Sequence, residues 1–105
     1  MVITTTVDEL DAARLRGCRI IDVREPHEYR AGHVPGAASL PVDRVPLHLA
    51  ELGRRRPVYL VCESGNRSLQ VARYLDSHGY QAHTVVGGTA AWRAAGRPVR
   101  RLVGA

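Results

Sequence analysis

The chain has 105 residues, is 45% hydrophobic, contains two cysteines and carries a formal net charge of +5. These values suit one domain over residues 1–105, with its core from about 7 to 99, and they exclude a disulfide-stapled fold. No apolar run approaches the roughly 20 residues of a membrane span, and the scattered arginines accompany no nucleic-acid motif, so we expect a soluble cytoplasmic protein that binds neither membranes nor nucleic acids.

The first predicted element is a short helix. Thr6 and Glu9 match a capping box, and Gly17 is placed to end the helix. Residues 18–23 follow as an apolar run typical of a buried strand. We expect Cys18, at the start of that run, to be a packing residue.

Charged residues follow the carboxyl end of this strand, where the ligand-facing residues of open α/β sheets collect. Asp22 and Arg24 lie there, and residues 26–37 are expected to form a short helical turn followed by a Gly/Pro turn. We expect Asp22, Arg24 and Glu28 to form structural hydrogen bonds and ion pairs rather than to catalyse. His33 is expected to stabilise the turn.

The middle of the chain contains weaker patterns. Residues 38–40 are expected to form a short edge strand, and 42–52 a helix with Pro46 in its first turn. The three arginines at 54–56 fit a solvated turn, with docking of an acidic partner as the alternative. The apolar stripe of the predicted helix comprises Val45, Leu49 and Leu52.

A strand, a loop and a helix follow, and they carry the main candidate site. Residues 58–61 form an apolar run that predicts a strand buried on both faces. From Arg67 the apolar spacing becomes helical, and Gly79 is placed to end that helix. Cys62 therefore lies between the carboxyl end of a strand and the amino end of a helix. The predicted buried face of the helix contains Leu69, Ala72 and Leu75.

This position has chemical consequences for Cys62. Unpaired N–H groups at a helix start, together with the helix dipole, favour negative charge in the loop, so we expect a nucleophilic thiolate. Arg67 adds a guanidinium to the rim. Gly65 and Asn66 tolerate left-handed backbone angles, so loop N–H groups can converge and hold a persulfide or an oxyanion. The alternative is an inert cysteine at a strand end.

The last predicted elements are a strand over 80–86 and a helix that follows Gly87 and Gly88. We expect Trp92 on that helix to be a packing anchor because of its size. The histidines show no pairing with cysteines or carboxylates at metal-ligand spacing, and no phosphate-binding loop is present. We therefore expect no metal and no nucleotide cofactor.

The loop from Cys62 to Ser68 resembles the active-site loop of rhodanese-type sulfurtransferases, in which cysteine, four variable residues and arginine precede serine or threonine. Related dual-specificity phosphatases and arsenate reductases have five residues between cysteine and arginine, whereas this chain has four. The Asp-Val-Arg segment at 22–24 with the turn at 32–37 resembles a second family signature. The Gly-Gly, Trp and Gly-x-Pro pattern within 87–98 resembles a third.

Strands alternating with helices predict a parallel sheet covered on both faces. The resemblance implies a rhodanese-like α/β fold with about five strands, in which Cys62 takes a sulfane sulfur from thiosulfate or a related persulfide donor. A thiophilic acceptor (cyanide, a thiol or a protein thiol) then receives the sulfur, and no cofactor takes part. Asp22 and Arg24 support the site, while substrate or persulfide binding falls to Glu63, Ser64, Gly65, Asn66, Arg67 and Ser68.

Glu63 places a negative charge beside the nucleophile, which favours a protein persulfide or another thiol compound over dianionic thiosulfate as the donor. Three alternatives are a non-catalytic or sulfur-carrier module of the same fold, a phosphatase-like or arsenate-reductase-like enzyme, and a redox pair of Cys18 and Cys62. The four-residue loop spacing disfavours the phosphatase. The placement of the cysteines at the start and end of different strands disfavours the redox pair.

Overall fold

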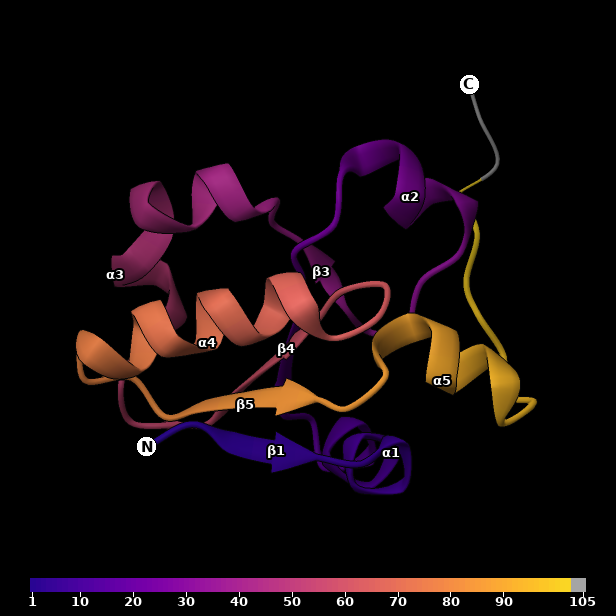
Figure 1. The fold of residues 1–105 in the computed structure, drawn as a ribbon, viewed down its shortest axis with the longest axis horizontal. Helices are drawn as coiled ribbons and strands as arrows, with labels where there is room; N and C mark the ends of the chain where they lie inside the picture. Colours follow the sequence, from indigo (N-terminus) through magenta and orange to yellow (C-terminus); the bar gives the residue numbers. More distant parts are fainter. Residues whose placement is uncertain (103–105) are drawn as a thin grey trace.

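The computed structural model describes residues 1–102 and has an α/β fold with one five-stranded parallel sheet (Figure 1). The strand order is β1-β5-β4-β2-β3, so β4 is central and β3 lies at an edge. The predicted fold class is confirmed. The strands are β1 (Ile3–Thr5), β2 (Arg19–Asp22), β3 (Ala38–Ser39), β4 (Val58–Val61) and β5 (Ala82–Val85). The helices are α1 (Val7–Leu15), α2 (Pro26–Ala31), the 3-10 helix η1 (Val42–His48), α3 (Leu49–Leu52), α4 (Asn66–Ser77) and α5 (Gly88–Ala94).

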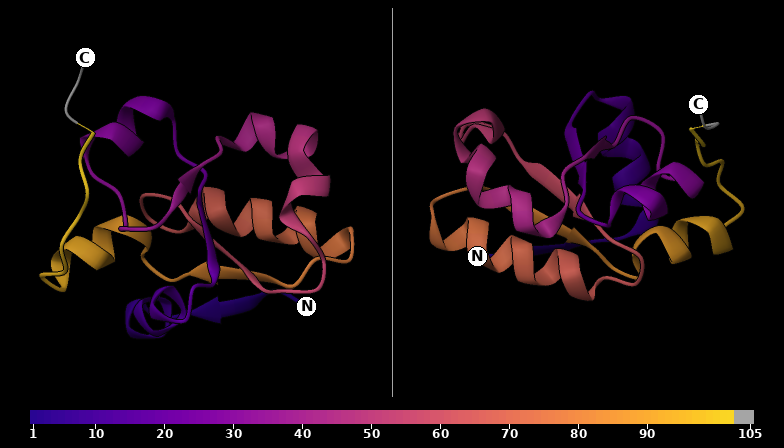
Figure 2. Two further views of the ribbon diagram at one scale, coloured as in Figure 1. Left: turned by 180° about the vertical axis from the view of Figure 1, so that it is seen from behind. Right: turned by 90° about the horizontal axis from the view of Figure 1, so that it is seen from above.

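Helices cover both faces of the sheet because successive side chains of a strand point to opposite faces. In β4, Val58 and Leu60 pack in one cluster with η1, α3 and α4. Tyr59 and Val61 pack in a second cluster with α1 and α5. Views from behind and above show the sheet between these two layers (Figure 2). All four residues of β4 are buried, as the apolar run predicts.

The first strand, β1, was not predicted from the residues. Two of its three residues are exposed, and it pairs only with β5, at the edge of the sheet. The helix after it begins as predicted. Thr6 Oγ1 accepts from the Glu9 N–H at 3.1 Å, and Glu9 accepts from the Thr6 N–H at 2.8 Å. The Thr6 backbone N–H that donates to the Glu9 carboxylate lowers the pKa of Glu9, and the Thr6 side chain adds to this effect.

The prediction of one α-helix over 42–52 is wrong. Residues 42–48 form a 3-10 helix, and only one α-helical turn, α3, follows. Pro46 lies inside η1, where its missing N–H removes a donor from a regular α-helix. The expected apolar side still faces the core, with Val45 and Leu52 buried and Leu49 packed against the same cluster.

The buried face of α4 differs slightly from its prediction. Ala72 and Leu75 are buried as expected, but Leu69 is only partly buried. Val71 and Ser68 occupy the remaining buried positions of the helix. A polar residue therefore faces the interior at the first turn, beside the loop that contains Cys62.

The carboxyl-terminal segment 97–102, which we call the strap, crosses back beside α2 (Figure 1). His33 and Arg100 form an antiparallel bridge in which each N–H donates to the other residue's carbonyl at 2.9 Å. Trp92 Nε1 donates to the Pro98 carbonyl at 2.7 Å, and the indole is 1% exposed. The strap is thus fixed both to α5 and to the turn after α2. None of the described helices is long and apolar enough to cross a membrane.

Candidate active site

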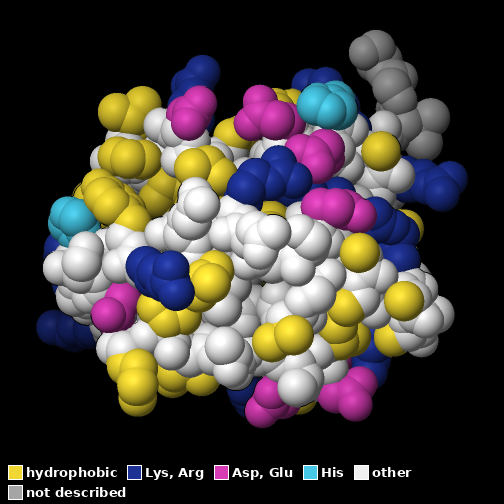
Figure 3. Space-filling model, in the orientation of Figure 1, with side chains coloured by type: hydrophobic (Ala, Val, Ile, Leu, Met, Phe, Trp, Pro, Cys, Tyr) yellow, Lys and Arg dark blue, Asp and Glu magenta, His cyan; other side chains and the backbone are white. Residues whose placement is uncertain are grey.

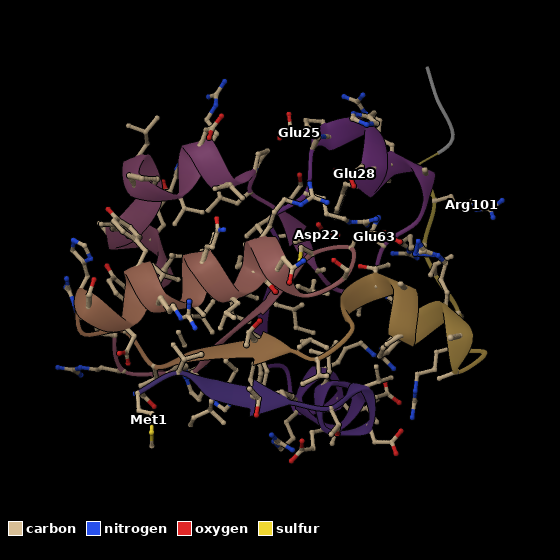
Figure 4. All side chains as sticks on the ribbon, viewed as in Figure 1. Met1, Asp22, Glu25, Glu28, Glu63 and Arg101 are labelled. Atoms are coloured by element: carbon tan, nitrogen blue, oxygen red, sulfur yellow. The ribbon has the colours of Figure 1, made fainter. Side chains whose placement is uncertain are left out.

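The loop between β4 and α4 lies at the carboxyl edge of the sheet, beside the carboxyl ends of β2 and β5. Gly65 caps α4 with a φ of 108°, a left-handed conformation that suits glycine. This turn reverses the chain directly after the central strand. Asp22, Glu28 and Glu63 converge on the same region from three different segments (Figure 4).

The sulfur atom of Cys62 lies inside the curve of this loop. The Gly65 N–H points at Sγ from 3.1 Å and the Ser68 N–H from 3.3 Å. The Ser68 hydroxyl is 3.5 Å from the same sulfur. The two N–H groups are the donors to the sulfur, and N–H donors of this kind stabilise negative charge on sulfur. The Cys62 residue is 1% exposed. We call the exposed side of the loop, at Ser64 and Asn66, its mouth.

Further N–H groups of the loop are available to a ligand. Among the residues that the structure describes, the N–H groups of Ser64, Asn66 and Arg67 have no hydrogen-bond partner. They belong to the turn around the sulfur and to the first residues of α4. A loop with unpaired N–H groups at a helix start can hold an anion.

The Ser68 hydroxyl is fixed by a partner that sequence reasoning missed. Thr84 Oγ1 on β5 lies 2.8 Å from Ser68 Oγ, and both residues are buried. The Ser68 hydroxyl also lies within 3.2 Å of the Gly65 carbonyl oxygen. A threonine within the predicted strand 80–86 was the available sign of this role.

The amino end of α5 holds the backbone of the loop. The Thr89 N–H donates to the Cys62 carbonyl at 2.8 Å, and the Thr89 hydroxyl donates to the same oxygen at 3.0 Å. The Ala90 N–H donates to the Glu63 carbonyl at 3.0 Å. Gly88, predicted only to lead into this helix, lies so close to these carbonyl groups that no side chain fits there.

Asp22 and Arg24 form a buried ion pair beneath the loop. Arg24 is 2% exposed, and its Nη2 donates to Asp22 Oδ2 and to the Gly32 carbonyl, both at 2.8 Å. Burial lowers the pKa of Arg24, but the hydrogen bonds and charge of Asp22 outweigh it, so the net shift is upward. Arg24 therefore stays charged, and its hydrogen bonds link β2 to the turn after α2.

The Glu63 carboxylate is held between two guanidinium groups. Glu63 Oε1 lies 3.1 Å from Arg24 Nη1, and Glu63 Oε2 lies 2.5 Å from Arg93 Nη2 on α5. Its negative charge is thus compensated, which removes most of the repulsion that the sequence suggested for a dianionic donor. Acidic and basic side chains gather around this part of the surface (Figure 3).

Arg67 is also paired, rather than free at the rim. Its Nη1 and Nη2 donate to the two carboxylate oxygens of Glu28 at 2.8 and 2.9 Å, in a bidentate arrangement. These bonds raise the pKa of Arg67 and lower the pKa of Glu28 to about 2. The ion pair joins α2 to α4 across the mouth of the site.

Acid should therefore weaken the contact between α2 and α4. A carboxylate with a lowered pKa contributes stability that is present above its ordinary value of 4.5 and is lost as the pH falls to about 2. We expect Glu28→Gln to unfold more easily than the wild type near neutral pH, because one ionic partner of Arg67 is lost. Urea unfolding across this pH range should show the difference shrinking with acid. If the difference in unfolding free energy between the two proteins stayed constant with pH, the charge of Glu28 would contribute nothing to stability.

His33 and Cys18 take structural positions. His33 is 2% exposed, stacks on Tyr29 with ring centroids 3.7 Å apart, and its Nδ1 lies 2.8 Å from the Tyr29 carbonyl. Cys18 precedes β2, and the register of β2 with β4 puts it level with Pro57. Cys62 lies farther along by roughly 16 Å, at about 3.3 Å per strand residue. The two thiols lie too far apart to form a redox pair.

No group of three or more metal-ligating side chains occurs within residues 1–102. The carboxyl edge of the sheet holds one buried thiol, with N–H donors directed at its sulfur and ion pairs around it.

Comparisons with known proteins agree on one protein family. The sequence profile of the Rhodanese-like domain family matches residues 6–95. A protein of Allochromatium vinosum named sulfurtransferase is 36% identical over 81 residues, which cover 76% of this chain and 76% of that protein. The thiosulfate sulfurtransferase GlpE of Tolumonas auensis is 37% identical over 75 residues, covering 70% of this chain and 71% of that protein.

A shorter match and a solved structure extend this result. A putative sulfur carrier protein of Bacillus subtilis, YrkF, is 37% identical over 62 residues, covering 59% of this chain and 34% of that protein. The crystal structure of a rhodanese-like domain protein from Staphylococcus aureus has a TM-score of 0.80 and 36% identity, and covers 86% of this chain and 90% of that one.

Proposed function

Because this chain belongs to the rhodanese-like domain family, we propose that it is a thiosulfate sulfurtransferase-type enzyme that carries a sulfane sulfur on Cys62. The observation that carries this proposal is the position of Cys62 Sγ, with the N–H groups of Gly65 and Ser68 directed at it from 3.1 and 3.3 Å. The donor is thiosulfate or a related persulfide. The acceptor is cyanide, a thiol or a protein thiol.

In the first half-reaction, the Cys62 thiolate attacks the outer sulfur of thiosulfate. A new S–S bond forms to Cys62 while the sulfur–sulfur bond of thiosulfate breaks, and sulfite leaves with the electron pair of that bond. The enzyme now carries a persulfide with one negative charge on its terminal sulfur. In the second half-reaction, the acceptor attacks that terminal sulfur, the S–S bond to Cys62 breaks, and the thiolate is restored.

The loop stabilises the negative charge that moves between these sulfur atoms. The unpaired N–H groups of Ser64, Asn66 and Arg67 lie around the mouth and are suited to the persulfide or the departing sulfite. Their positions depend on the bonds that tie the loop to α5 and on the ion pairs of Arg24. Asp22 and Arg24 are thus positioning residues that touch neither sulfur.

The compensated charge of Glu63 keeps thiosulfate a suitable donor. Both of its neighbours at the carboxylate, Arg24 and Arg93, are cationic, so a dianion approaching the mouth meets no isolated negative charge. A phosphatase reaction fits less well, because the loop has only four residues between Cys62 and Arg67. Arg67 is, moreover, engaged by Glu28 at both of its terminal nitrogens.

The similarity to the sulfur carrier YrkF supports a second candidate, in which Cys62 holds sulfur for a partner but does not turn over with small acceptors. One experiment separates the candidates. The reduced protein is incubated with thiosulfate, analysed by intact-protein mass spectrometry, and then exposed to cyanide with thiocyanate measured. Hydrolysis of an aryl phosphate by the same preparation is measured in parallel.

We expect the mass of one added sulfur atom, loss of that mass with cyanide, and repeated thiocyanate production. Stable added sulfur without repeated turnover would favour the carrier. Aryl phosphate hydrolysis faster than sulfur transfer would overturn the proposal.

A further inference from the structure

The end of the sheet opposite Cys62 contains a hollow of about 880 Å³. It lies between the end of α1, the start of β2 and the turn that joins α3 to β4. Figures 1 and 2 show this turn on the side of the molecule away from the loop after β4. The proposed sulfur chemistry makes no use of this region.

The hollow is strongly cationic. It is lined by five arginines and one acidic residue, Glu51, which together carry four of the five net positive charges of the chain. Within residues 1–102, no carboxylate lies within ion-pair distance of any of the five. Like charges this close raise the potential of the hollow and attract anions. The five are Arg16, Arg19, Arg54, Arg55 and Arg56.

Two of these arginines are held in place by the fold. Arg19 Nη1 donates to the Glu51 carbonyl at 2.9 Å, and Arg54 Nε donates to the His78 carbonyl at 2.9 Å while its guanidinium lies over the Tyr80 ring. Arg55 and Arg56 make no side-chain hydrogen bond within the described part of the chain, and both are exposed. The hollow thus contains two arginines with fixed orientations and two exposed arginines whose guanidinium groups are available to a ligand.

A second hollow, of about 440 Å³, continues from the first toward the edge strand β3. The two share five lining residues, of which one is acidic: Arg19, Ile21, Ala38, Glu51 and Leu52. Arg44 adds another cation to the second hollow. Together they form an elongated groove, which we call the basic groove, whose wall includes the exposed edge of the sheet.

The shape and lining of the basic groove select a class of ligand. Its lining includes apolar groups of Ile21, Leu52, Leu40 and Pro41, so a purely ionic ligand would leave that surface unused. No Phe, Tyr or Trp lines either hollow, so the groove offers no aromatic platform for stacking bases. Arginine pairs bidentately with carboxylates, and an exposed sheet edge pairs with an extended backbone.

We propose that the basic groove binds an extended acidic peptide segment of a partner protein, with carboxylates on the arginines and apolar side chains between them. The Cys62 loop lies at the other end of the sheet and stays open while the segment is bound. The groove therefore binds a partner without blocking sulfur transfer. This binding does not depend on whether Cys62 catalyses repeated sulfur transfer.

The test uses a fluorescein-labelled peptide of roughly twelve residues in which glutamates alternate with leucines, long enough to follow the groove as a strand. Fluorescence anisotropy at low ionic strength measures its affinity for the full chain. We expect Arg55→Glu/Arg56→Glu to weaken binding about tenfold or more, because two attractions become repulsions. Cys62→Ser should bind the peptide as the wild type does.

A matched variant controls for net charge. Arg73→Glu/Arg101→Glu changes the total charge by the same amount at exposed positions outside the groove, and Figure 4 shows Arg101 pointing away from the domain. We expect it to weaken binding by no more than about twofold at moderate salt. Equal losses in the two double variants would overturn the proposal.

Two further measurements identify the ligand class. Tripolyphosphate and a thymidine oligonucleotide are tested as competitors at matched total charge, and displacement as effective as that by unlabelled peptide would contradict a peptide site.

In Cys62→Ser the half-buried Cys18, which lines the groove, is the only thiol. We expect bound peptide to slow its alkylation by a maleimide, and unchanged alkylation at saturating peptide would place the peptide elsewhere.

Discussion

Replacing Cys62 by serine is expected to lower sulfur transfer from thiosulfate to cyanide by at least about a thousandfold, because the variant lacks the nucleophile that carries the sulfur. The fold should change little. A serine hydroxyl can accept hydrogen bonds from the same Gly65 and Ser68 N–H groups that point at the sulfur. Thiocyanate production measures the loss, and thermal unfolding followed by circular dichroism checks the fold.

Cys18→Ser is the matched control, since it removes the other thiol roughly 16 Å away by strand geometry. It should retain transfer, with some loss of stability from placing a hydroxyl in a half-buried position. Appreciable turnover by Cys62→Ser would exclude the proposed mechanism. Loss of activity in a folded Cys18→Ser variant would instead require a second thiol in the reaction.

Gly88→Ala should distort the loop that contains Cys62, although Gly88 itself takes no part in the reaction. A Cβ there would overlap the Cys62 carbonyl oxygen and lie 2.8 Å from the Glu63 carbonyl oxygen, and Gly88 has a φ of 57°. Strain and overlap together should cost about 3 kcal/mol or more of unfolding free energy. The sulfur transfer of the protein that still folds should fall too, because α5 would be pushed away from the loop that it holds.

Gly17→Ala separates the two causes. Gly17 also has a left-handed φ, of 79°, but nothing lies within 4 Å of the added Cβ. It should cost about 1 kcal/mol, from backbone strain alone, and leave activity unchanged. Urea unfolding and thiocyanate assays on both variants make the comparison. If the two substitutions lowered stability and activity equally, the close approach of Gly88 to the loop would not contribute to either.

The central strand and its loop could be predicted because their signals are local. The apolar run 58–61, the cysteine after it and the helical spacing from Arg67 are consecutive in the sequence, and the structure places them as strand, loop and helix. The capping box at Thr6 and Glu9 is equally local. Each of these elements is specified by its own residues and needs no information from the rest of the chain.

Elements that depend on tertiary contacts were missed or misjudged. β1 has three residues, two of them exposed, and exists because β5 offers an edge for pairing. The segment 42–52 has helical apolar spacing, but spacing does not distinguish a 3-10 helix from an α-helix when a proline lies inside it.

The electrostatics of the site were the least predictable part. Glu63 looked like an unpaired charge because the sequence gives no sign that Arg24 and Arg93, far away in both directions, converge on it. Arg67 looked free for the same reason, since Glu28 lies on another helix. The sequence shows which side chains are charged. Which opposite charges lie beside them depends on how the chain folds.

The strap gives the carboxyl-terminal segment a part in the local stability of the site. Its hydrogen bonds to His33 and Arg30 hold the end of α2, the helix from which Glu28 reaches Arg67. We expect these segments to open together as one cooperative unit, at a free energy below that of global unfolding. Such an opening would release Arg67 from Glu28, so the frequency of local opening would set how often a free guanidinium lies beside the loop.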